Sequence, residues 1–227
     1  MFLYYFFETF AHSCKGLGIY NPSERDSRTL LFYNLFISQP DYVLQKMKSK
    51  HVLILGCGGI GNFIAYFLAS SGIGKLTLVD MDTIELSNLN RQCFFTEEDV
   101  GKKKSEILKR ELLKRNSSLE IDIIPFHITS EADLELLPRV DLIVQSADTP
   151  RDLTFWVNNY SIRRRIPFIS IGYVVDIAVW GPFVVPGKTG CWCCSQLVVD
   201  CSSQSEEAKM WLQKIGNVFF RRPAVGR

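Results

Sequence analysis

The sequence lacks a marked excess of charge of either sign. Its 26 lysines and arginines and 24 aspartates and glutamates leave a net charge of +2 over 227 residues. Proteins that bind nucleic acids electrostatically concentrate far more basic residues on one face, so no nucleic-acid partner is expected. Apolar residues make up 47% of the chain and charged residues 22%, which is typical of a globular protein with a substantial core.

Long apolar runs are also missing. No uninterrupted apolar stretch reaches the roughly 18 residues that a membrane-spanning helix needs, so no membrane insertion is expected. The aromatic opening MFLYYFFETF carries Glu8 and has neither a basic segment before it nor a small-residue cleavage site after it. A secretory signal peptide would have both features. We therefore expect a cytoplasmic protein.

The cysteines do not form the even-numbered set of a disulfide framework. There are seven, and three of them, Cys191, Cys193 and Cys194, crowd into the sequence CWCC. Adjacent bridges there would be strained. Metal ligands or free thiols in a reducing compartment fit this pattern better.

From His51 onward, apolar segments typical of strands alternate with segments typical of helices. The expected strands are HVLILG, KLTLVD, IDIIPF, DLIVQSA and PFISIGYV, and the expected helices lie at residues 61–72, 101–116, about 131–137 and 151–165. This alternation predicts an α/β fold with a Rossmann-like, mostly parallel sheet and helices on both faces. The segment DIAVWGPFVVP has no helix before it, so we expect an antiparallel strand at the sheet edge.

The chain divides into two parts of unequal size. Residues 1–24 are aromatic and then turn-rich, and they are expected to be an N-terminal appendage. Residues 25–227 are expected to form the α/β domain, which opens with a helical segment at 27–47 broken near Pro40.

A glycine-rich turn follows the first strand and precedes a helix. Its glycines are Gly56, Gly58 and Gly61, and Asp80 ends the next strand. Glycines let phosphates approach the backbone, the helix N-terminus offers free N–H groups, and a carboxylate at this distance can bind ribose hydroxyls. A tight turn without a ligand is the alternative. The turn alone would serve a dehydrogenase, a methyltransferase or an ATP-using enzyme.

Two further segments favour ATP. The polar run SNLNRQ, residues 87–92, places Arg91 beyond Asp80, and a guanidinium suits phosphate oxygens. The alternative is that this run is an ordinary Asx-rich loop without a ligand. Three lysines, residues 102–104, then begin a helix, where cations are disfavoured by about 0.3–1 kcal/mol each. Either the acidic residues 97–99 or a bound phosphate offsets this unfavourable placement of positive charge.

Asp148 is expected to emerge at the carboxyl end of a strand, beside the phosphates. Magnesium is held by one or two carboxylates together with phosphate oxygens, so this aspartate is a candidate magnesium ligand. The alternative is that Asp148 caps the helix that follows.

Taken in order, GCGGIGN, VDMDTIELSNLNRQ, DVGKKK, SAD and PGKTGCWCC resemble the signature of ThiF/MoeB-type adenylyltransferases of the ubiquitin-activating superfamily. The resemblance covers about residues 23–227 and is strongest to the microcin C-type branch, which has near counterparts of ILKRELLKRNS and GYVVDIAVWGPFVVPGKTGC. It implies an adenylation domain that uses ATP and magnesium.

The resemblance assigns roles to individual positions. It places the nucleotide over Gly56, Gly58 and Gly61 and gives Asp80 the role of binding the ribose. It places the triphosphate against Ser87, Asn88, Leu89, Asn90 and Arg91, and makes Lys104 the lysine that binds phosphate. It makes Asp148 the magnesium ligand, and Thr149 stands where many relatives have asparagine. Lys102 and Lys103 are bystanders. Arg28 matches an arginine that relatives donate to the ATP site of a second subunit, which implies a homodimer.

The resemblance also raises the question of zinc. Relatives hold a structural zinc with two Cys-x-x-Cys pairs, and Cys191 with Cys194 matches the first, but no second pair follows before Arg227. Structural zinc needs four ligands. Zinc and free thiols at a vestigial site both stay open, and the domain is expected to be truncated at its C-terminus.

The expected reaction is ATP-dependent adenylation of the C-terminus of a short peptide, with release of pyrophosphate. Activation of a small ubiquitin-like or sulfur-carrier protein is an alternative, and a truncated, non-catalytic nucleotide-binding module is another. A dehydrogenase is disfavoured because the nearest equivalent of a Tyr-x-x-x-Lys pair is Tyr160 with Arg164, and arginine stays protonated. Neither Cys93, expected to be buried, nor Cys57 is expected to act as a thioester nucleophile.

Overall fold

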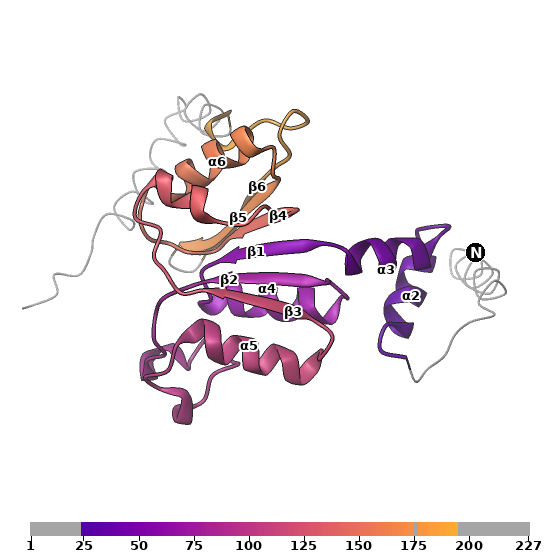
Figure 1. Ribbon diagram of the computed structural model, residues 1–227, viewed down its shortest axis with the longest axis horizontal. Coiled ribbons are helices and arrows are strands. Elements are labelled where there is room, and N and C mark those ends of the chain that lie inside the picture. Colours follow the sequence, from indigo (N-terminus) through magenta and orange to yellow (C-terminus); the bar gives the residue numbers. More distant parts are fainter. Residues whose placement is uncertain (1–23, 175–176, 195–227) are drawn as a thin grey trace, which may run out of the picture.

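The computed structural model describes residues 24–174 and 177–194. A six-stranded sheet forms the centre of this structure (Figure 1). The strands are β1 (His51–Leu55), β2 (Lys75–Val79), β3 (Glu120–Ile124), β4 (Leu142–Gln145), β5 (Phe168–Val174) and β6 (Ile177–Val184). Their spatial order is β3-β2-β1-β4-β5-β6. All pairs are parallel except β5 with β6, which confirms the predicted Rossmann-like sheet with its antiparallel edge strand.

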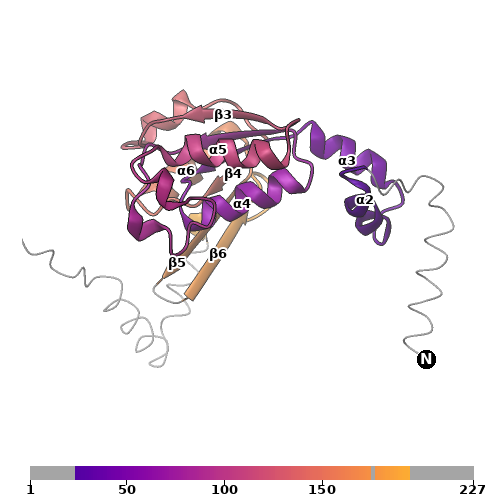
Figure 2. The ribbon, with the colours of Figure 1, turned by 90° about the horizontal axis from the view of Figure 1, so that it is seen from below.

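Helices cover both faces of this sheet, as predicted. The α-helices are α2 (Ser27–Asn34), α3 (Pro40–Lys48), α4 (Gly59–Ser70), α5 (Lys104–Arg115) and α6 (Leu153–Arg164), and the 3₁₀ helices are η1 (Leu86–Asn88), η2 (Glu97–Asp99) and η3 (Glu131–Leu136). Helices α4 and α5 lie together against one face (Figure 2). Helix α6 packs with η3 on the other face.

The two faces bury separate apolar clusters, and β1 shows why. Val52 and Ile54 point into the cluster under α4 and α5, whereas Leu53 and Leu55 point into the cluster under α6 and η3. Successive side chains of a strand alternate between faces, so a central parallel strand buried on both sides reads as a continuous apolar run. The segment HVLIL is such a run.

Helices α2 and α3 lie beyond the amino ends of β1 and β2 (Figure 1). A side chain at Gly74, just before β2, would bring its Cβ to 1.8 Å from the carbonyl oxygen of Lys48. Glycine at position 74 therefore permits α3, which ends at Lys48, to lie directly against the start of β2. The break near Pro40 is where the structure separates α2 from α3.

The helix expected at about 131–137 is present as the 3₁₀ helix η3, which is six residues long and ends ahead of Pro138, a residue that disfavours helical backbone at the position before it. The predicted start of the helix at 101–116 is wrong. Helix α5 begins at Lys104, because Gly101 has φ +88° and Lys103 is extended. Residues 102 and 103 therefore precede the helix. Asp152, not Asp148, occupies the N-cap position of α6.

No helix in residues 24–174 and 177–194 has both the length and the apolar character needed to cross a bilayer.

We predict that Leu78→Ala lowers the free energy of unfolding by about 2–5 kcal/mol. Leu78 is fully buried on β2 under α4 and α5, so truncation removes apolar contacts and leaves a cavity. Urea unfolding measures the change. The matched control is Leu86→Ala, whose side chain is 65% exposed and whose loss should change stability by less than about 0.5 kcal/mol. Equal effects of the two variants would contradict the packing described here.

Candidate nucleotide-binding site

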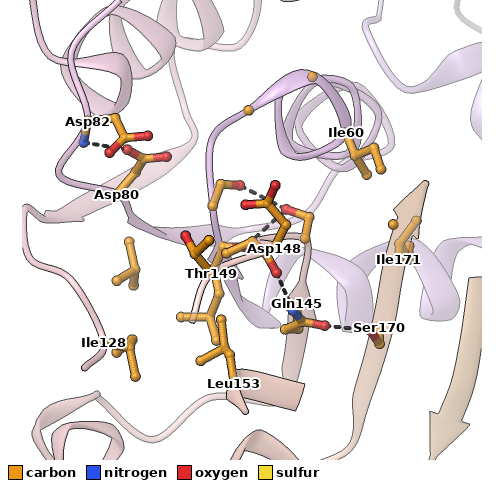
Figure 3. Close-up of a pocket in the computed structure, with 18 of the residues that line it drawn as sticks. Ile60, Asp80, Asp82, Ile128, Gln145, Asp148, Thr149, Leu153, Ser170 and Ile171 are labelled. Carbon is orange, nitrogen blue, oxygen red and sulfur yellow. Dashed lines mark hydrogen bonds between the residues drawn. The ribbon is translucent and has the colours of Figure 1, made fainter. Parts of the chain in front are cut away.

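A cleft of about 560 Å³ opens at the carboxyl ends of the strands. Residues that follow β1, β2 and β4 line it, together with residues of β5 and β6 (Figure 3). Strand β1 lies between β2 and β4, so the strand order reverses at this point. Open α/β sheets bind their ligands in the crevice at such a switch point.

The three glycines of the β1–α4 turn have different reasons to be glycine. Gly56 has φ +91°, and its Cβ would approach the Ala147 nitrogen to 2.8 Å. A Cβ at Gly61 would lie 1.9 Å from the Gly56 carbonyl oxygen. At Gly58, by contrast, nothing lies closer than the Gln92 side chain at 3.9 Å. The fold requires glycine at positions 56 and 61, whereas Gly58 leaves the floor of the cleft open.

Asp80 follows β2 and is tied to this turn. One carboxylate oxygen accepts a hydrogen bond from the Cys57 N–H at 2.6 Å, and the other accepts one from the Asp82 N–H at 2.8 Å. Burial raises the pKa of Asp80, although these two backbone donors oppose the shift. Each carboxylate oxygen can accept more than one hydrogen bond, so Asp80 suits neutral hydroxyl donors such as those of a ribose.

Lys104 reaches the same cleft from the first turn of α5. Its side chain is largely buried, and its Nζ lies 2.8 Å from the Asp82 carboxylate. The His127 ring nitrogen lies 3.7 Å from the other Asp82 oxygen. The acidic residues 97–99 do not compensate Lys104, since the Asp99 carboxylate instead pairs with Lys102 at 3.3 Å. Asp82 was not predicted as a site residue, and its only signal in the sequence is its place two residues after Asp80.

The loop after β2 contributes fewer residues than predicted. Arg91 lines the cleft, and its guanidinium donates to the Ser87 carbonyl and the Asn90 side chain, both at 3.0 Å. Ser87, Leu89 and Asn90 are not among the lining residues. Asn88 lines a smaller neighbouring cleft of about 460 Å³, which it shares with Lys104.

Gln92 is a site residue that sequence analysis left without a role. It lines the cleft, is 2% exposed, and its buried side-chain oxygen has no hydrogen-bond partner in the described part of the chain. Burying an unsatisfied polar atom is costly, so Gln92 is poised for a donor from a ligand. Its only sequence signal was its place directly after Arg91.

Asp148 and Thr149 follow β4 at the centre of the cleft (Figure 3). The Asp148 side chain is exposed, and no cation from residues 24–174 and 177–194 pairs with it. A single free carboxylate facing a cleft suits magnesium carried in with nucleotide phosphates. Asp148 therefore fits the ion that the resemblance implies.

Beneath Asp148, the buried Gln145 connects β4 to β5. Its side-chain amide donates to the Ala147 carbonyl, and its oxygen accepts hydrogen bonds from Ser170 and Thr154. All three hydrogen-bonded side chains line the cleft. This network was not predicted, because its members are separated in sequence and no motif joins them.

Other predicted site residues lie away from the cleft. Arg28 is exposed in the first turn of α2, beyond the amino ends of the strands, so one chain does not bring it to the nucleotide side. Cys191 and Cys194 place their sulfur atoms 3.5 Å apart. In the described residues, no cluster of three or more histidine, cysteine or acidic side chains could hold a metal, and Cys201 lies outside them.

Cys57 and Cys93, which were not expected to act as nucleophiles, differ in burial. Cys57 is completely buried, and burial raises the pKa of its thiol well above the ordinary value, which disfavours the reactive thiolate. Cys93, expected to be buried, is exposed. The residue that packs into the core from this loop is Phe95, which is 5% exposed.

Comparisons with known proteins agree with this geometry. The model of the ThiF family matches residues 28–215. The sulfur carrier protein ThiS adenylyltransferase of Escherichia coli is 30% identical over 175 residues, which cover 74% of this chain and 68% of that protein. The sulfur carrier protein adenylyltransferase of Thermus thermophilus is 36% identical over 104 residues, which cover 46% of this chain and 38% of that protein.

Solved structures of E. coli MccB are also similar. MccB with ATP is 44% identical with a TM-score of 0.76, and the match covers 92% of this chain and 59% of that chain. The microcin C7 biosynthetic enzyme MccB in complex with N-formylated MccA is 50% identical with a TM-score of 0.76, covering 79% and 52%. The chain thus spans little more than half the length of these MccB chains.

We predict that Gly58→Ala weakens ATP binding about tenfold or more while changing the free energy of unfolding by less than about 1 kcal/mol. The new methyl group makes only an ordinary contact with the Gln92 side chain, at 3.9 Å, and occupies the open floor of the cleft. Gly61→Ala is the matched control, because its Cβ collides with the Gly56 carbonyl and should cost about 1–3 kcal/mol of stability. ATP titration and urea unfolding separate the two. Unchanged ATP affinity in Gly58→Ala would place the nucleotide elsewhere.

Proposed function

The chain belongs to the ThiF family, and we propose that it adenylates the C-terminus of a short peptide with ATP and releases pyrophosphate. We assign this activity to residues 25–227. The observation that carries the proposal is one cleft in which Asp80, Arg91, Lys104 and Asp148 meet. Support for a peptide acceptor comes from the MccB structures, which are solved with ATP and with MccA.

The protein's own residues account for nucleotide binding in this proposal. Gly58 leaves room for the nucleotide over the turn, and Asp80 accepts hydrogen bonds from the ribose hydroxyls. Arg91 and Lys104 neutralise the phosphates. Lys104 stays paired with Asp82 until a ligand arrives, which lowers the cost of holding a largely buried charge.

Asp148 would hold magnesium against the phosphate oxygens, and the ion supplies positive charge that stabilises the departing pyrophosphate. In the reaction, a terminal oxygen of the acceptor attacks the α-phosphorus in line. The new bond joins that oxygen to phosphorus, and the bond from the α-phosphorus to the bridging oxygen breaks. Arg91 and Lys104 stabilise the charge that develops on the leaving group. No protein nucleophile takes part, which agrees with the burial of Cys57.

Activation of a sulfur-carrier protein is the second candidate. It is favoured by the names of the relatives, since both the E. coli and the Thermus thermophilus proteins are sulfur carrier protein adenylyltransferases. The nucleotide half of the reaction is the same in both candidates. The acceptor distinguishes them.

We predict that the chain, incubated with ATP, magnesium and MccA, adds one adenylyl group to the C-terminus of the peptide. Mass spectrometry of the products and a pyrophosphate assay detect the transfer. Asp148→Asn, which keeps the size of the side chain but loses its charge, should lower the rate about a hundredfold or more and retain ATP binding.

The acceptor arms of this experiment decide between the candidates. Transfer to the C-terminus of a ThiS-type carrier, with none to MccA, would replace peptide adenylation with carrier activation. Absence of transfer to both, in folded protein that binds ATP, would leave a nucleotide-binding module without this activity. Full activity of Asp148→Asn would refute the magnesium assignment.

A homodimer in which Arg28 acts on the partner subunit's ATP is part of the proposal. Within one chain, α2 lies beyond the amino ends of the strands (Figure 1), whereas the cleft opens at their carboxyl ends, so Arg28 would not serve its own site. A two-fold symmetric dimer would exchange the two arginines reciprocally.

We predict that mixing Arg28→Ala subunits with Asp148→Ala subunits restores activity that neither variant has alone. One site of each mixed dimer would combine an intact Asp148 with an intact Arg28, so a random mixture should reach about a quarter of the wild-type rate. Adenylation assays of subunits co-refolded in equal amounts measure this value. A confirmed mixed dimer with no recovered activity would exclude the shared site.

A further inference from the structure

Strand β4 ends in a buried polar residue. Its first three residues, Leu142, Ile143 and Val144, are apolar, whereas the fourth is Gln145, which is only 4% exposed. A buried amide costs stability unless its hydrogen-bonding groups find partners. An apolar side chain would fill this position without that requirement, so the partners of the amide indicate what it adds.

The amide of Gln145 is oriented by these partners. Its nitrogen donates to the Ala147 carbonyl, which can only accept, so its oxygen points the other way. That oxygen accepts hydrogen bonds from the hydroxyls of Ser170 and, at 3.4 Å, of Thr154. Ser170 is the residue of β5 that pairs in register with Gln145. The side chain is therefore held between the loop after β4 and the neighbouring strand (Figure 3).

The hydrogen bond to the Ala147 carbonyl acts on Asp148. A peptide bond is planar, so the carbonyl oxygen of one residue lies in one plane with the N–H and the Cα of the next. Holding the Ala147 oxygen therefore fixes the plane that carries the backbone N–H and Cα of Asp148. The direction in which the Asp148 side chain leaves the backbone depends on this plane.

The other side of the loop is held by Ser146. Its N–H and its hydroxyl both donate to the Leu55 carbonyl, and the hydroxyl also donates to the Gly56 carbonyl at 2.9 Å. The Asp148 side chain, two residues later, is exposed in the cleft. The loop is thus fixed from two sides up to the residue before Asp148, and the carboxylate itself faces the space where a ligand binds.

We propose that Gln145 is the positioning residue of Asp148, the proposed magnesium ligand, and that Ser170 keeps the Gln145 amide in place. The hydrogen bond to the Ala147 carbonyl directs the Asp148 carboxylate toward the phosphates. Side chains that orient a metal ligand in this way strengthen metal binding without touching the ion. This inference rests on the proposed function, because it concerns the ion that Asp148 is proposed to hold.

The test measures binding of Mn²⁺, a spectroscopic substitute for magnesium, to the full chain carrying the ATP analogue AMPCPP. Gln145→Met keeps the length of the side chain and removes the amide. It should weaken Mn²⁺ binding about tenfold or more in electron paramagnetic resonance titrations, while the affinity for AMPCPP, measured by calorimetry in EDTA, stays unchanged. Ser170→Ala should also weaken Mn²⁺ binding, because the Gln145 amide loses a partner that orients it.

Asn116 offers a matched control for the loss of a buried amide. It is 4% exposed, its nitrogen donates to the Ala69 carbonyl, and its oxygen accepts a hydrogen bond from the Ser118 hydroxyl. It caps the C-terminal end of α5 and is not among the residues that line the cleft. Asn116→Leu should lower stability in urea, as Gln145→Met does, and leave both the Mn²⁺ and the AMPCPP affinity unchanged.

The positioning role is overturned by unchanged Mn²⁺ affinity in Gln145→Met, or by an equal loss of AMPCPP affinity in EDTA, because Gln145 would then support the whole cleft. If Gln145→Met does not fold, unchanged Mn²⁺ affinity in Ser170→Ala overturns the role instead. An equal loss of Mn²⁺ affinity in Asn116→Leu also overturns it, because reduced stability would explain both variants. Unchanged Mn²⁺ affinity in Asp148→Asn refutes the magnesium ligand of the proposed function, and the positioning role fails with it.

Discussion

The close packing of the β1–α4 turn against the ends of β2 and β4 is the constraint on which the rest of the structure depends. Gly61 brings α4 onto the Gly56 carbonyl, and Gly56 in turn lies against the backbone of Ala147. The Ser146 hydroxyl donates to the Leu55 and Gly56 carbonyls. These contacts hold the turn at the reversal of strand order, so the open floor above Gly58 faces Asp80 and Asp148.

The charged side chains of the cleft are held by contacts within the protein. Asp82 pairs with Lys104, and two backbone N–H groups donate to the half-buried Asp80 carboxylate. Buried charges are tolerated when they are paired or hydrogen-bonded. A nucleotide that binds beside Asp80 and Lys104 would replace contacts within the protein by contacts with its own hydroxyl and phosphate groups. It therefore finds its cationic and hydroxyl-accepting groups already oriented, which reduces the entropy lost on binding.

The end of the cleft formed by β5 and β6 has a different physical character, because it is lined by residues without charge, Ser170, Ile171, Gly172, Tyr173 and Val179. Its wall is built by an edge hairpin, whereas the glycine turn and the carboxylates belong to the central strands. In the described residues, the contacts that hold Asp80 and Lys104 come from the glycine turn and from Asp82, not from β5 or β6.

The sequence by itself determined the sheet, the helices on both faces, the glycine turn and the placement of Asp80, Lys104 and Asp148 around one cleft. Local patterns are sufficient for these features, because apolar periodicity specifies strands and helices and because parallel strands bring their carboxyl ends to one edge. Only the tertiary structure decided which neighbours these residues meet. Asp82 as the partner of Lys104 and the Gln145–Ser170 network depend on side chains that come together from elements distant in sequence. No local pattern encodes such contacts, since they follow from how the strands are ordered and how the faces pack.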